Sequence, residues 1–406
     1  MIDKSTPGSV FFLPYGTRLF DRLVDFMKVQ QRMFGFEHVV TPLIYKSELW
    51  QTSGHWQHYK RDMFQVLGAH HGEAGGEQPE EVFGLKPMNC PGHCVMFGQY
   101  ERSFRELPVR YADFSPLHRN EASGALTGLT RVRKFHQDDG HIFCEPEQVQ
   151  QEIEGCLKLI DSVYGVFGLR DYQLTLSTRP DEFSGEAAAW DAAENGLRQA
   201  LDQTGKVWTV NAGDGAFYGP KIDILVTDNN GKQHQTATIQ LDFQLPRNFG
   251  LTYASSEREA SATPVLIHRA VYGSIERFMS LLIDHYQGKW PFWMNPRQAV
   301  VIPVASRHHA YAQQVLDELS GRGATKDTPG RLDAKFYHVE MMAQEDTVGN
   351  RIRHALSQGF SYILMVGDRE IENNTVAIRP RDNRKTQNMS VDEVKALFDN
   401  LQNSYL

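Results

Sequence analysis

The stretch from His118 to Cys144 concentrates side chains that could do chemistry. It reads HRNEASGALTGLTRVRKFHQDDGHIFC, with a strand expected before it at 109–114 and another inside it at 131–135. Arg119 follows the first strand and Arg131 opens the second. Arginine can hold a polyphosphate through paired N–H groups, which lysine cannot reproduce. Because Phe135 could also stack on a base, the stretch predicts an active site that binds a nucleotide.

Two arginines far apart in the chain, Arg119 and Arg277, stand in structured surroundings where an unpaired guanidinium is costly. Each of them therefore needs an anion. From the residues alone, that anion is either a ligand or a neighbouring carboxylate. The neighbouring carboxylate is Glu121 for Arg119 and Glu276 for Arg277.

Cys90, His141 and His268 are residue types that zinc accepts as ligands, but dozens of residues separate them and they match no local finger pattern. A buried free cysteine and two hydrogen-bonded histidines would explain the same residues. The segment CPGHC at 90–94 holds ligand types close together and is a second candidate, although no second half of such a site is visible.

Three further polar residues allow two interpretations each. The pair Asp138 and Asp139 either binds a metal or an amine, or forms a solvated turn. Tyr218, which follows the glycine-rich segment AGDG, is either a ligand contact or a core aromatic residue with a satisfied hydroxyl.

The elements that must position these residues follow from the apolar pattern. An amphipathic helix is predicted over 16–34 and a strand over 38–44, which Pro42 interrupts and therefore places at an edge or interface. The clearest hairpin joins 221–226 to 235–243 around Asn230 and Gly231. Its second strand alternates apolar and polar residues, so a half-open antiparallel sheet is expected to carry a ligand on its polar face, beside Lys221 and Asp223.

A strand at 264–268 and a helix from Ser274 come next. The pattern then changes to βαβ alternation, with strands at 299–304, 334–337 and 362–366 and helices at 311–319 and 347–356. The segments 67–81 and 321–333 are predicted to be loops.

Composition limits the classes of protein that remain. A chain of 406 residues is expected to form two or three domains, and its net charge of −8 argues against a uniformly basic coat for nucleic acid, while it allows a local cationic face. No apolar run reaches the roughly 20 residues of a membrane helix. Four cysteines make no disulfide framework. The first residues resemble neither a signal peptide nor a transit segment.

In this order, the pieces resemble the class II aminoacyl-tRNA synthetases. The region around Pro42 resembles motif 1, a dimer element; residues 111–135 resemble motif 2; and GSIERF at 273–278 resembles motif 3. The threonyl family within this class is indicated by SGHW (53–56), KPMNCPGH (86–93), QDDGHIFC (137–144), GAFYGPK (215–221), QLDF (240–243) and IHRA (267–270). The resemblance covers nearly the whole chain and is closest to fungal mitochondrial forms without the N-terminal editing domain.

The resemblance implies an α+β catalytic domain over residues 1–294, with a class II antiparallel sheet flanked by helices, and a smaller α/β anticodon-binding domain over 295–406. It implies a threonine–tRNA ligase that works as a homodimer and without a membrane. L-threonine attacks the α-phosphorus of ATP to give threonyl-adenylate and pyrophosphate, and the terminal ribose of tRNA(Thr) then takes the threonyl group. Mg²⁺ is expected to accompany ATP, because clustered phosphate charges need a divalent ion.

Carried over by position, the family's zinc ligands fall on Cys90, His141 and His268, with one Zn²⁺ per subunit. Threonine can give both its amine and its hydroxyl to an open zinc position, whereas isosteric valine has no hydroxyl. The implied contacts to threonine are Asp139 at the hydroxyl, Tyr218 at the amine, Gln137 at the carboxylate end, and Met88.

The resemblance also assigns contacts to the nucleotide and tRNA. Arg119 would bridge the threonine carboxylate and the α-phosphate with help from Lys221, while Arg131 and Arg277 would reach the outer phosphates. The remaining implied contacts are Phe135 and Arg277 on the two faces of adenine, Glu121 at its edge, Gln240 and Ser274 beside the nucleotide or substrate, His55 as a helper of the transfer, and Glu370 and Arg379 on unpaired anticodon bases.

Two expectations concern departures from the family. Members commonly carry N-terminal domains with an editing site, and this chain begins almost at the catalytic core, which favours the mitochondrial matrix over the cytoplasm as its location. Serine shares the amine and hydroxyl that zinc would recognise and lacks only a methyl group, so measurable activation of serine is predicted.

Overall fold

The computed structural model describes residues 1–67, 82–256, 261–322 and 334–406. The predicted loops at 67–81 and 321–333 lie almost entirely outside these residues. In the described part of the chain, no helix has the length and apolar character needed to span a membrane. The described residues form two compact units, one from 1–11 and 23–285 and the other from 12–22 and 286–406. The domain boundary after residue 294 stays a prediction.

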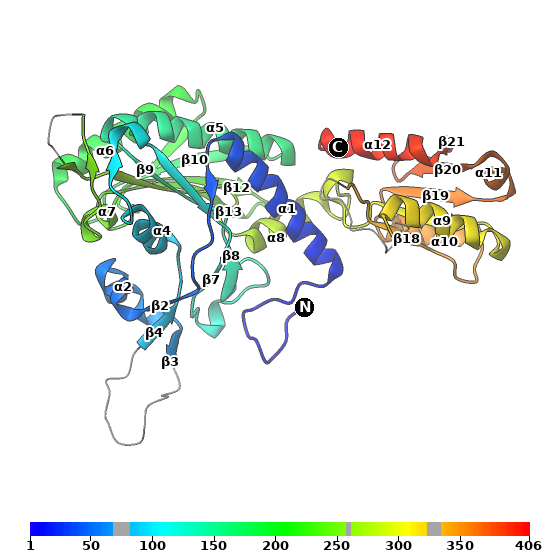
Figure 1. The fold of residues 1–406 in the computed structure, drawn as a ribbon, viewed down its shortest axis with the longest axis horizontal. Helices are drawn as coiled ribbons and strands as arrows, with labels where there is room; N and C mark the ends of the chain where they lie inside the picture. Colours follow the sequence, from blue (N-terminus) through cyan, green and yellow to red (C-terminus); the bar gives the residue numbers. More distant parts are fainter. Residues whose placement is uncertain (68–81, 257–260, 323–333) are drawn as a thin grey trace, which may run out of the picture. The chain divides into compact units, whose positions relative to one another are not determined.

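The first unit is built on an eight-stranded sheet (Figure 1). In spatial order its strands are β1 (Glu37–His38), β6 (Val109–Asp113), β9 (Asp139–Cys144), β16 (Val265–Ala270), β13 (Gln233–Asp242), β12 (Lys221–Thr227), β10 (Tyr172–Ser177) and β11 (Trp208–Asn211). The two outermost pairs, β1 with β6 and β10 with β11, are parallel, and all inner pairs are antiparallel. The predicted α+β class is confirmed.

The hairpin of β12 and β13 confirms the alternation predicted for it. Ile239 and Leu241 are buried beneath the sheet, whereas Gln240 is only partly buried and pairs across the ladder with Lys221. Burying an aliphatic side chain of this size contributes about 1.5–3 kcal/mol, and a slip of one residue would move the whole set to the opposite face. The apolar pattern therefore fixes which side chains face the site.

The helices up to residue 286 are α1 (Pro14–Met33), α2 (Ser47–Thr52), α3 (His55–Tyr59), α4 (Cys90–Phe97), α5 (Val149–Phe167), α6 (Ala187–Gln203), α7 (Leu245–Asn248) and α8 (Ile275–Tyr286). Helices lie on both faces of the large sheet, but α2 packs on a smaller sheet and α3 packs on α2. Phe167 of α5 packs edge-on against Phe278 of α8, and their ring centroids lie 5.2 Å apart. On the other face, α4 and α7 share a core cluster that includes Cys94, Phe97 and Leu245.

Three smaller sheets complete the first unit. They are β2 (Ile44–Lys46), β4 (Val82–Leu85) and β3 (Gln65–Leu67); β15 (Ser261–Ala262), β14 (Tyr253–Ala254) and β5 (Arg102–Ser103); and β7 (Pro116–His118) with β8 (Lys134–His136). The strand predicted at 38–44 is wrong: β1 ends at His38, at an edge of the large sheet, β2 begins at Ile44, and Pro42 lies in the loop between them. The strand predicted at 131–135 begins only at Lys134, because Arg131 forms a single bridge with Thr127 within the preceding loop.

The second unit is an α/β domain, as predicted. Its sheet has the order β18 (Val339–Met341), β17 (Ala299–Pro303), β19 (Tyr362–Val366), β20 (Thr375–Pro380) and β21 (Gln387–Ser390), and its helices are α9 (His309–Ser320), α10 (Val348–Ser357), α11 (Asp368–Asn373) and α12 (Val391–Asn403). The strand predicted at 334–337 is wrong. Residues 334–336 are exposed, and Tyr337 instead packs against Phe398, so the strand forms at Val339.

Candidate active site and metal centre

A row of paired residues crosses four strands of the large sheet. Lys221 on β12 pairs with Gln240 on β13, Gln240 with His268 on β16, and His268 with His141 on β9. Residues directly opposite each other in a ladder project to the same face. Four predicted site residues from distant parts of the sequence therefore stand side by side, which only the register of the strands could reveal.

Cys90, the first residue of α4, completes a cluster with two members of this row. One ligand atom from each of Cys90, His141 and His268 lies within 4.8 Å of the others, and all three residues are buried. In the described part of the chain, this is the one group of three or more such residues placed to hold a metal ion. The alternative metal site within residues 90–94 does not form, because Cys94 lies in the apolar core cluster with Phe97.

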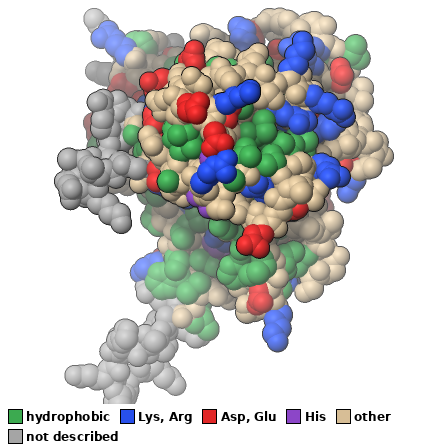
Figure 2. All heavy atoms as spheres, turned by 90° about the vertical axis from the view of Figure 1, so that its right-hand side faces the viewer, with side chains coloured by type: hydrophobic (Ala, Val, Ile, Leu, Met, Phe, Trp, Pro, Cys, Tyr) green, Lys and Arg blue, Asp and Glu red, His purple; other side chains and the backbone are tan. Residues whose placement is uncertain are grey.

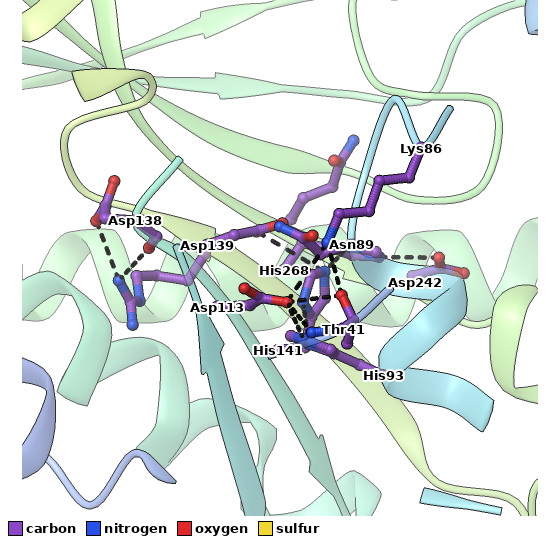
Figure 3. Close-up of polar contacts among 12 residues, drawn as sticks. Thr41, Lys86, Asn89, His93, Asp113, Asp138, Asp139, His141, Asp242 and His268 are labelled. Carbon is purple, nitrogen blue, oxygen red and sulfur yellow. Dashed lines mark hydrogen bonds and ion pairs between the residues drawn. The ribbon is translucent and has the colours of Figure 1, made fainter. Parts of the chain in front are cut away.

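The histidine nitrogens fit a metal. Nε2 of His268 donates to Oδ2 of Asp242 at 2.9 Å (Figure 3), so its Nδ1 is the nitrogen left with a lone pair. That Nδ1 lies 2.9 Å from Nε2 of His141. Two nitrogens on one tetrahedral zinc would stand about 3.3 Å apart, so a small spreading of the rings would admit the ion.

Burial sets the charge states of this cluster. It raises the pKa of the Cys90 thiol well above its usual value, and the nearby carboxylates of Asp139 and Asp242 raise it further. Burial and the neighbouring His93 also hold the pKa of His141 well below its usual value. A neutral imidazole is the form that binds metal, and a thiolate in these surroundings needs a cation beside it.

The two consecutive aspartates are both buried, so their interpretation as a solvated turn is wrong. Asp138 accepts hydrogen bonds from Arg269 and from the backbone N–H groups of Val271 and Tyr272, and burial raises its pKa to about 7. It therefore holds the strands together. Asp139 accepts from the Asn89 amide at 3.0 Å and lies 3.9 Å from Nε2 of His141, on the metal-facing side.

Tyr218 lies against the same cluster. Its hydroxyl donates to Oε1 of Gln240 at 2.9 Å, and its ring centroid is 5.8 Å from that of His268. Burial, followed by Asp242 and Cys90, raises the pKa of this phenol well above its usual value. Met88 packs beside Cys90 at the edge of the α4 core cluster.

A cavity of about 320 Å³ collects most of the residues predicted to contact ATP. Those that line it are Arg119, Glu121, Arg131, Phe135, Ser274 and Arg277, whereas Gln240 does not. Gln137, predicted at the carboxylate end of threonine, lines it as well. Gly273 permits the close approach of its turn, because its φ is +75° and a Cβ there would collide with the carbonyl oxygen of Thr236. A cavity of about 490 Å³ between α5, α6 and β10 is lined by none of the predicted site residues.

The alternative in which Glu121 and Glu276 neutralise the two arginines is wrong. Arg119 donates to the Pro87 carbonyl at 3.2 Å, and Arg277 donates to the Thr130 carbonyl at 3.1 Å. Neither guanidinium forms an ion pair with a carboxylate of the described residues. Glu276 instead receives two hydrogen bonds from the backbone and ring of His136. Glu121 pairs with Arg131 at 2.8 Å.

Lys221 and His55 have partners of their own. The ammonium of Lys221 lies 2.9 Å from Asp223 and 3.3 Å from Asp214, and these carboxylates raise its pKa although burial opposes them. His55 is buried and shares a hydrogen bond of 2.8 Å with Ser53. Its ring lies 5.9 Å from that of Tyr59.

The predicted tRNA contacts lie in the second unit. Glu370 on α11 accepts a hydrogen bond from the N–H of Gly367, and Arg379 lies on β20. On the face turned to the viewer in Figure 2, lysine and arginine side chains are spread among acidic and apolar ones.

Sequence reasoning gave no role to the polar residues behind the metal cluster. His93 contacts His141, Asp113 lies behind His93, and Lys86 and Thr41 surround Asp113 (Figure 3). The only signal was that Lys86 and His93 stand in the motif that also contains Cys90. Their mutual contacts depend on how α4 docks on the sheet, which no local pattern encodes.

Known proteins resemble this chain over its whole length. Residues 74–286 match the model of the tRNA synthetase class II core domain (G, H, P, S and T), and residues 298–401 match the anticodon binding domain. The probable mitochondrial threonine–tRNA ligase of Schizosaccharomyces pombe is 48% identical over 97% of this chain and 85% of its own length. Human cytoplasmic threonine–tRNA ligase 1 is 49% identical over 93% of this chain and 49% of its own length.

Among solved structures, the RNA-binding domain of threonyl-tRNA synthetase from Cryptosporidium parvum Iowa II superimposes with a TM-score of 0.90. It is 43% identical and covers 99% of this chain and 95% of the solved chain. Both the sequence and the fold therefore agree with the motifs, and the chain belongs to the threonyl-tRNA synthetase family of class II aminoacyl-tRNA synthetases.

Proposed function

We propose that the chain selects threonine through a zinc ion held by Cys90, His141 and His268. The observation that carries the proposal is the convergence of these three buried residues beside Tyr218 and Asp139. A zinc ion held there would supply an open coordination position that the amine and hydroxyl of threonine can fill and that valine cannot.

The chain's own residues would then complete the amino-acid pocket. Tyr218 and Asp139 carry oxygen atoms that can accept from the threonine amine and hydroxyl, and Gln137 lines the arginine cavity. Met88 supplies an apolar wall. Asn89 holds Asp139 through a hydrogen bond of 3.0 Å, which fixes the direction of its carboxylate.

We further propose that the arginine cavity binds ATP, which class II synthetases use with Mg²⁺, for adenylate formation. Arg119 would hold the threonine carboxylate and the α-phosphate together, so that the carboxylate oxygen attacks the phosphorus in line and pyrophosphate leaves. Arg131 and Arg277 would neutralise the leaving phosphates. Phe135, whose ring already lies 5.1 Å from the Arg119 guanidinium, offers its face to adenine.

Glu121 must leave Arg131, at least in part, to meet the edge of adenine. That exchange of partners is inexpensive, because Arg131 is exposed and exposed ion pairs contribute about 0.2–1 kcal/mol. Gln240 and Ser274 stand beside the reacting groups. Lys221 would assist at the α-phosphate by releasing one of its two carboxylate partners.

The transfer step takes the threonyl group from the adenylate to the terminal ribose hydroxyl of tRNA(Thr). We propose that His55 assists this step, since Tyr59 beside its ring is close enough to Tyr218 to contribute to the raised pKa of that phenol. Residues 1–294 would carry the catalysis and residues 295–406 would bind the anticodon, with Glu370 and Arg379 as contacts to bases.

We also propose a homodimer that works in the mitochondrial matrix. The exposed apolar side chains around motif 1 support the dimer: Val29, Met33, Val40, Leu43 and Ile44. The mitochondrial relative of Schizosaccharomyces pombe, 48% identical to this chain, supports the compartment. Fractionation of cells that express the tagged native gene would test the compartment.

A single experiment tests the proposed selection. Pyrophosphate exchange is measured with threonine and with valine for the wild-type chain and for Cys90→Ser, and the zinc content of each is determined. The proposal requires zinc in the active wild type, threonine preferred over valine, and loss of zinc and of threonine-dependent exchange together in the variant.

A further inference from the structure

His141 meets a third histidine on the side away from His268. Its Nδ1 lies 2.9 Å from Nδ1 of His93, the two rings stand at 85°, and both are buried (Figure 3). One of the two nitrogens must carry the proton and the other must accept it. The choice decides whether Nε2 of His141, the atom turned toward His268, carries a proton or a lone pair.

Asp113 determines which nitrogen of His93 carries the proton. Its Oδ2 lies 3.8 Å from Nε2 of His93, which is too long for a hydrogen bond, and among the described residues that Nε2 has no hydrogen-bond partner. A carboxylate at this distance in a buried region attracts an N–H group and repels a lone pair. A proton on His93 therefore belongs on Nε2, which leaves its Nδ1 to accept from His141.

Neighbouring groups keep Asp113 ionised in this role. Burial alone would raise the pKa of its carboxyl group, but its contacts, including those with Ser115, Lys86 and Thr41, outweigh burial and lower the pKa. Thr41 donates to Asp113 through its hydroxyl at 2.7 Å, and the Lys86 ammonium donates to that hydroxyl at 2.6 Å. The ammonium itself lies 3.6 Å from the carboxylate.

With a metal ion between the two rings, both facing nitrogens would have to be acceptors. Asp242 fixes the proton of His268 on Nε2, and its own carboxylate is held by the backbone N–H groups of Gln244 and Leu245. Nε2 of His141 and Nδ1 of His268 lie 2.9 Å apart, a hydrogen-bond distance at which His141 can hold its proton on Nε2 in the metal-free chain. When the ion binds, His141 must carry that proton on Nδ1, where His93 accepts it.

We propose that His93, oriented by Asp113, is a positioning residue that fixes the proton of His141 on Nδ1 and so prepares the two facing nitrogens for a metal ion. This inference rests on the proposed metal site and deepens it. His93 would accept the Nδ1 proton that His141 must carry when its Nε2 binds the metal, so that the affinity for the metal depends on a residue that does not touch it.

The test measures the affinity of the full chain for zinc by competition with a chromophoric chelator. His93→Leu removes the acceptor and is expected to weaken zinc binding about 10–100-fold, the usual effect of losing an outer partner of a ligand. His93→Asn keeps a carbonyl oxygen near the place of Nδ1 and is expected to retain most of the affinity. Cys94→Ala, at the next position along α4 and equally buried, is the matched control and should leave the affinity unchanged.

A second measurement needs no variant. Histidine-selective ¹⁵N labelling reports which ring nitrogens carry protons, and the inference expects a proton on Nδ1 of His141 and on Nε2 of His93 in the zinc-loaded chain. A proton on Nδ1 of His93 overturns it, and so does His93→Leu binding zinc as tightly as the wild type. A wild-type chain that binds no zinc would instead overturn the proposed metal site and this inference with it.

Discussion

Arg277 lies close enough to Arg119 for their positive charges to repel each other. Burial and then this repulsion lower the pKa of the Arg277 guanidinium, with a further contribution from Arg131, and Glu121 offsets only part of the effect. Such a gathering of cations costs free energy in the free chain, and an anionic ligand recovers it. The proposed binding of a polyphosphate in this cavity would therefore relieve a repulsion that destabilises the free chain.

The first prediction concerns this trade-off. Arg277→Gln should lower kcat/KM for ATP in pyrophosphate exchange by about 10²–10³-fold, because it removes a cation that stabilises charge in the transition state. The Tm of the free chain should not fall, since the repulsion within the cluster is relieved. Arg307→Gln, which removes an exposed arginine paired with Asp368 in the second unit, is the control with unchanged exchange. Unchanged ATP kinetics in Arg277→Gln would contradict the proposed role.

The predictable part of the structure is the part that local patterns encode. The alternation in 235–243 indicated correctly which face of β13 is polar, and the strand predicted at 362–366 coincides with β19. The failure at 334–337 has a physical reason, since an apolar Tyr337 marks burial but not strand pairing. Aromatic residues are buried in helices, strands and loops alike, so the sequence pattern alone could not show whether Tyr337 belongs to a strand.

The unpredictable part is what the tertiary fold brings together. Spacing alone could not bring Cys90, His141 and His268 to one place, because their approach depends on the register of β16 against β9 and on the docking of α4. The roles of Asp113 and Asp242 were equally hidden. A buried carboxylate behind a histidine leaves no periodic signal in the chain.

A second prediction concerns amino-acid choice. Serine keeps the amine and hydroxyl and loses one methyl group, so the chain should activate it at a kcat/KM about 10–200-fold below that of threonine. Pyrophosphate exchange with each amino acid, purified free of the other, gives the ratio. Serine rejected as strongly as valine would mean that the pocket recognises the methyl group by means other than its size.

The third prediction concerns assembly. Val40, 89% exposed next to the edge strand β1, should lie in the interface of the homodimer. Val40→Asp is expected to shift the chain toward monomers in sedimentation velocity. Val207→Asp removes a valine with the same 89% exposure elsewhere on the sheet and should leave the dimer intact. A dimer unaffected by Val40→Asp would show that motif 1 is not the contact.

The fourth prediction concerns pH and the second unit. Burial, followed by repulsion from Arg18 and Arg22, lowers the pKa of His338 to about 4. A histidine whose folded pKa lies below the unfolded value of 6.5 resists protonation in the folded chain. The unfolded chain therefore binds more protons between these values, and stability falls as the pH drops through this window, by at most about 3 kcal/mol from this group.

His338→Gln removes the penalty. The Tm of the variant minus the Tm of the wild type should therefore increase as the pH is lowered from 7.5 to 5. Differential scanning calorimetry of the full chain measures this difference. His354→Gln, which replaces an exposed histidine of the same unit, serves as the control and should show no such trend. If the difference in Tm between His338→Gln and the wild type were the same at both pH values, the lowered pKa of His338 would be contradicted.

The most direct test of the central claim is the zinc content of the purified chain, measured alongside its exchange activity with threonine and valine. The account predicts about one zinc per chain, a strong preference for threonine, and the simultaneous loss of zinc and of threonine-dependent exchange in Cys90→Ser. A chain that is free of metal and still activates threonine fully would contradict it.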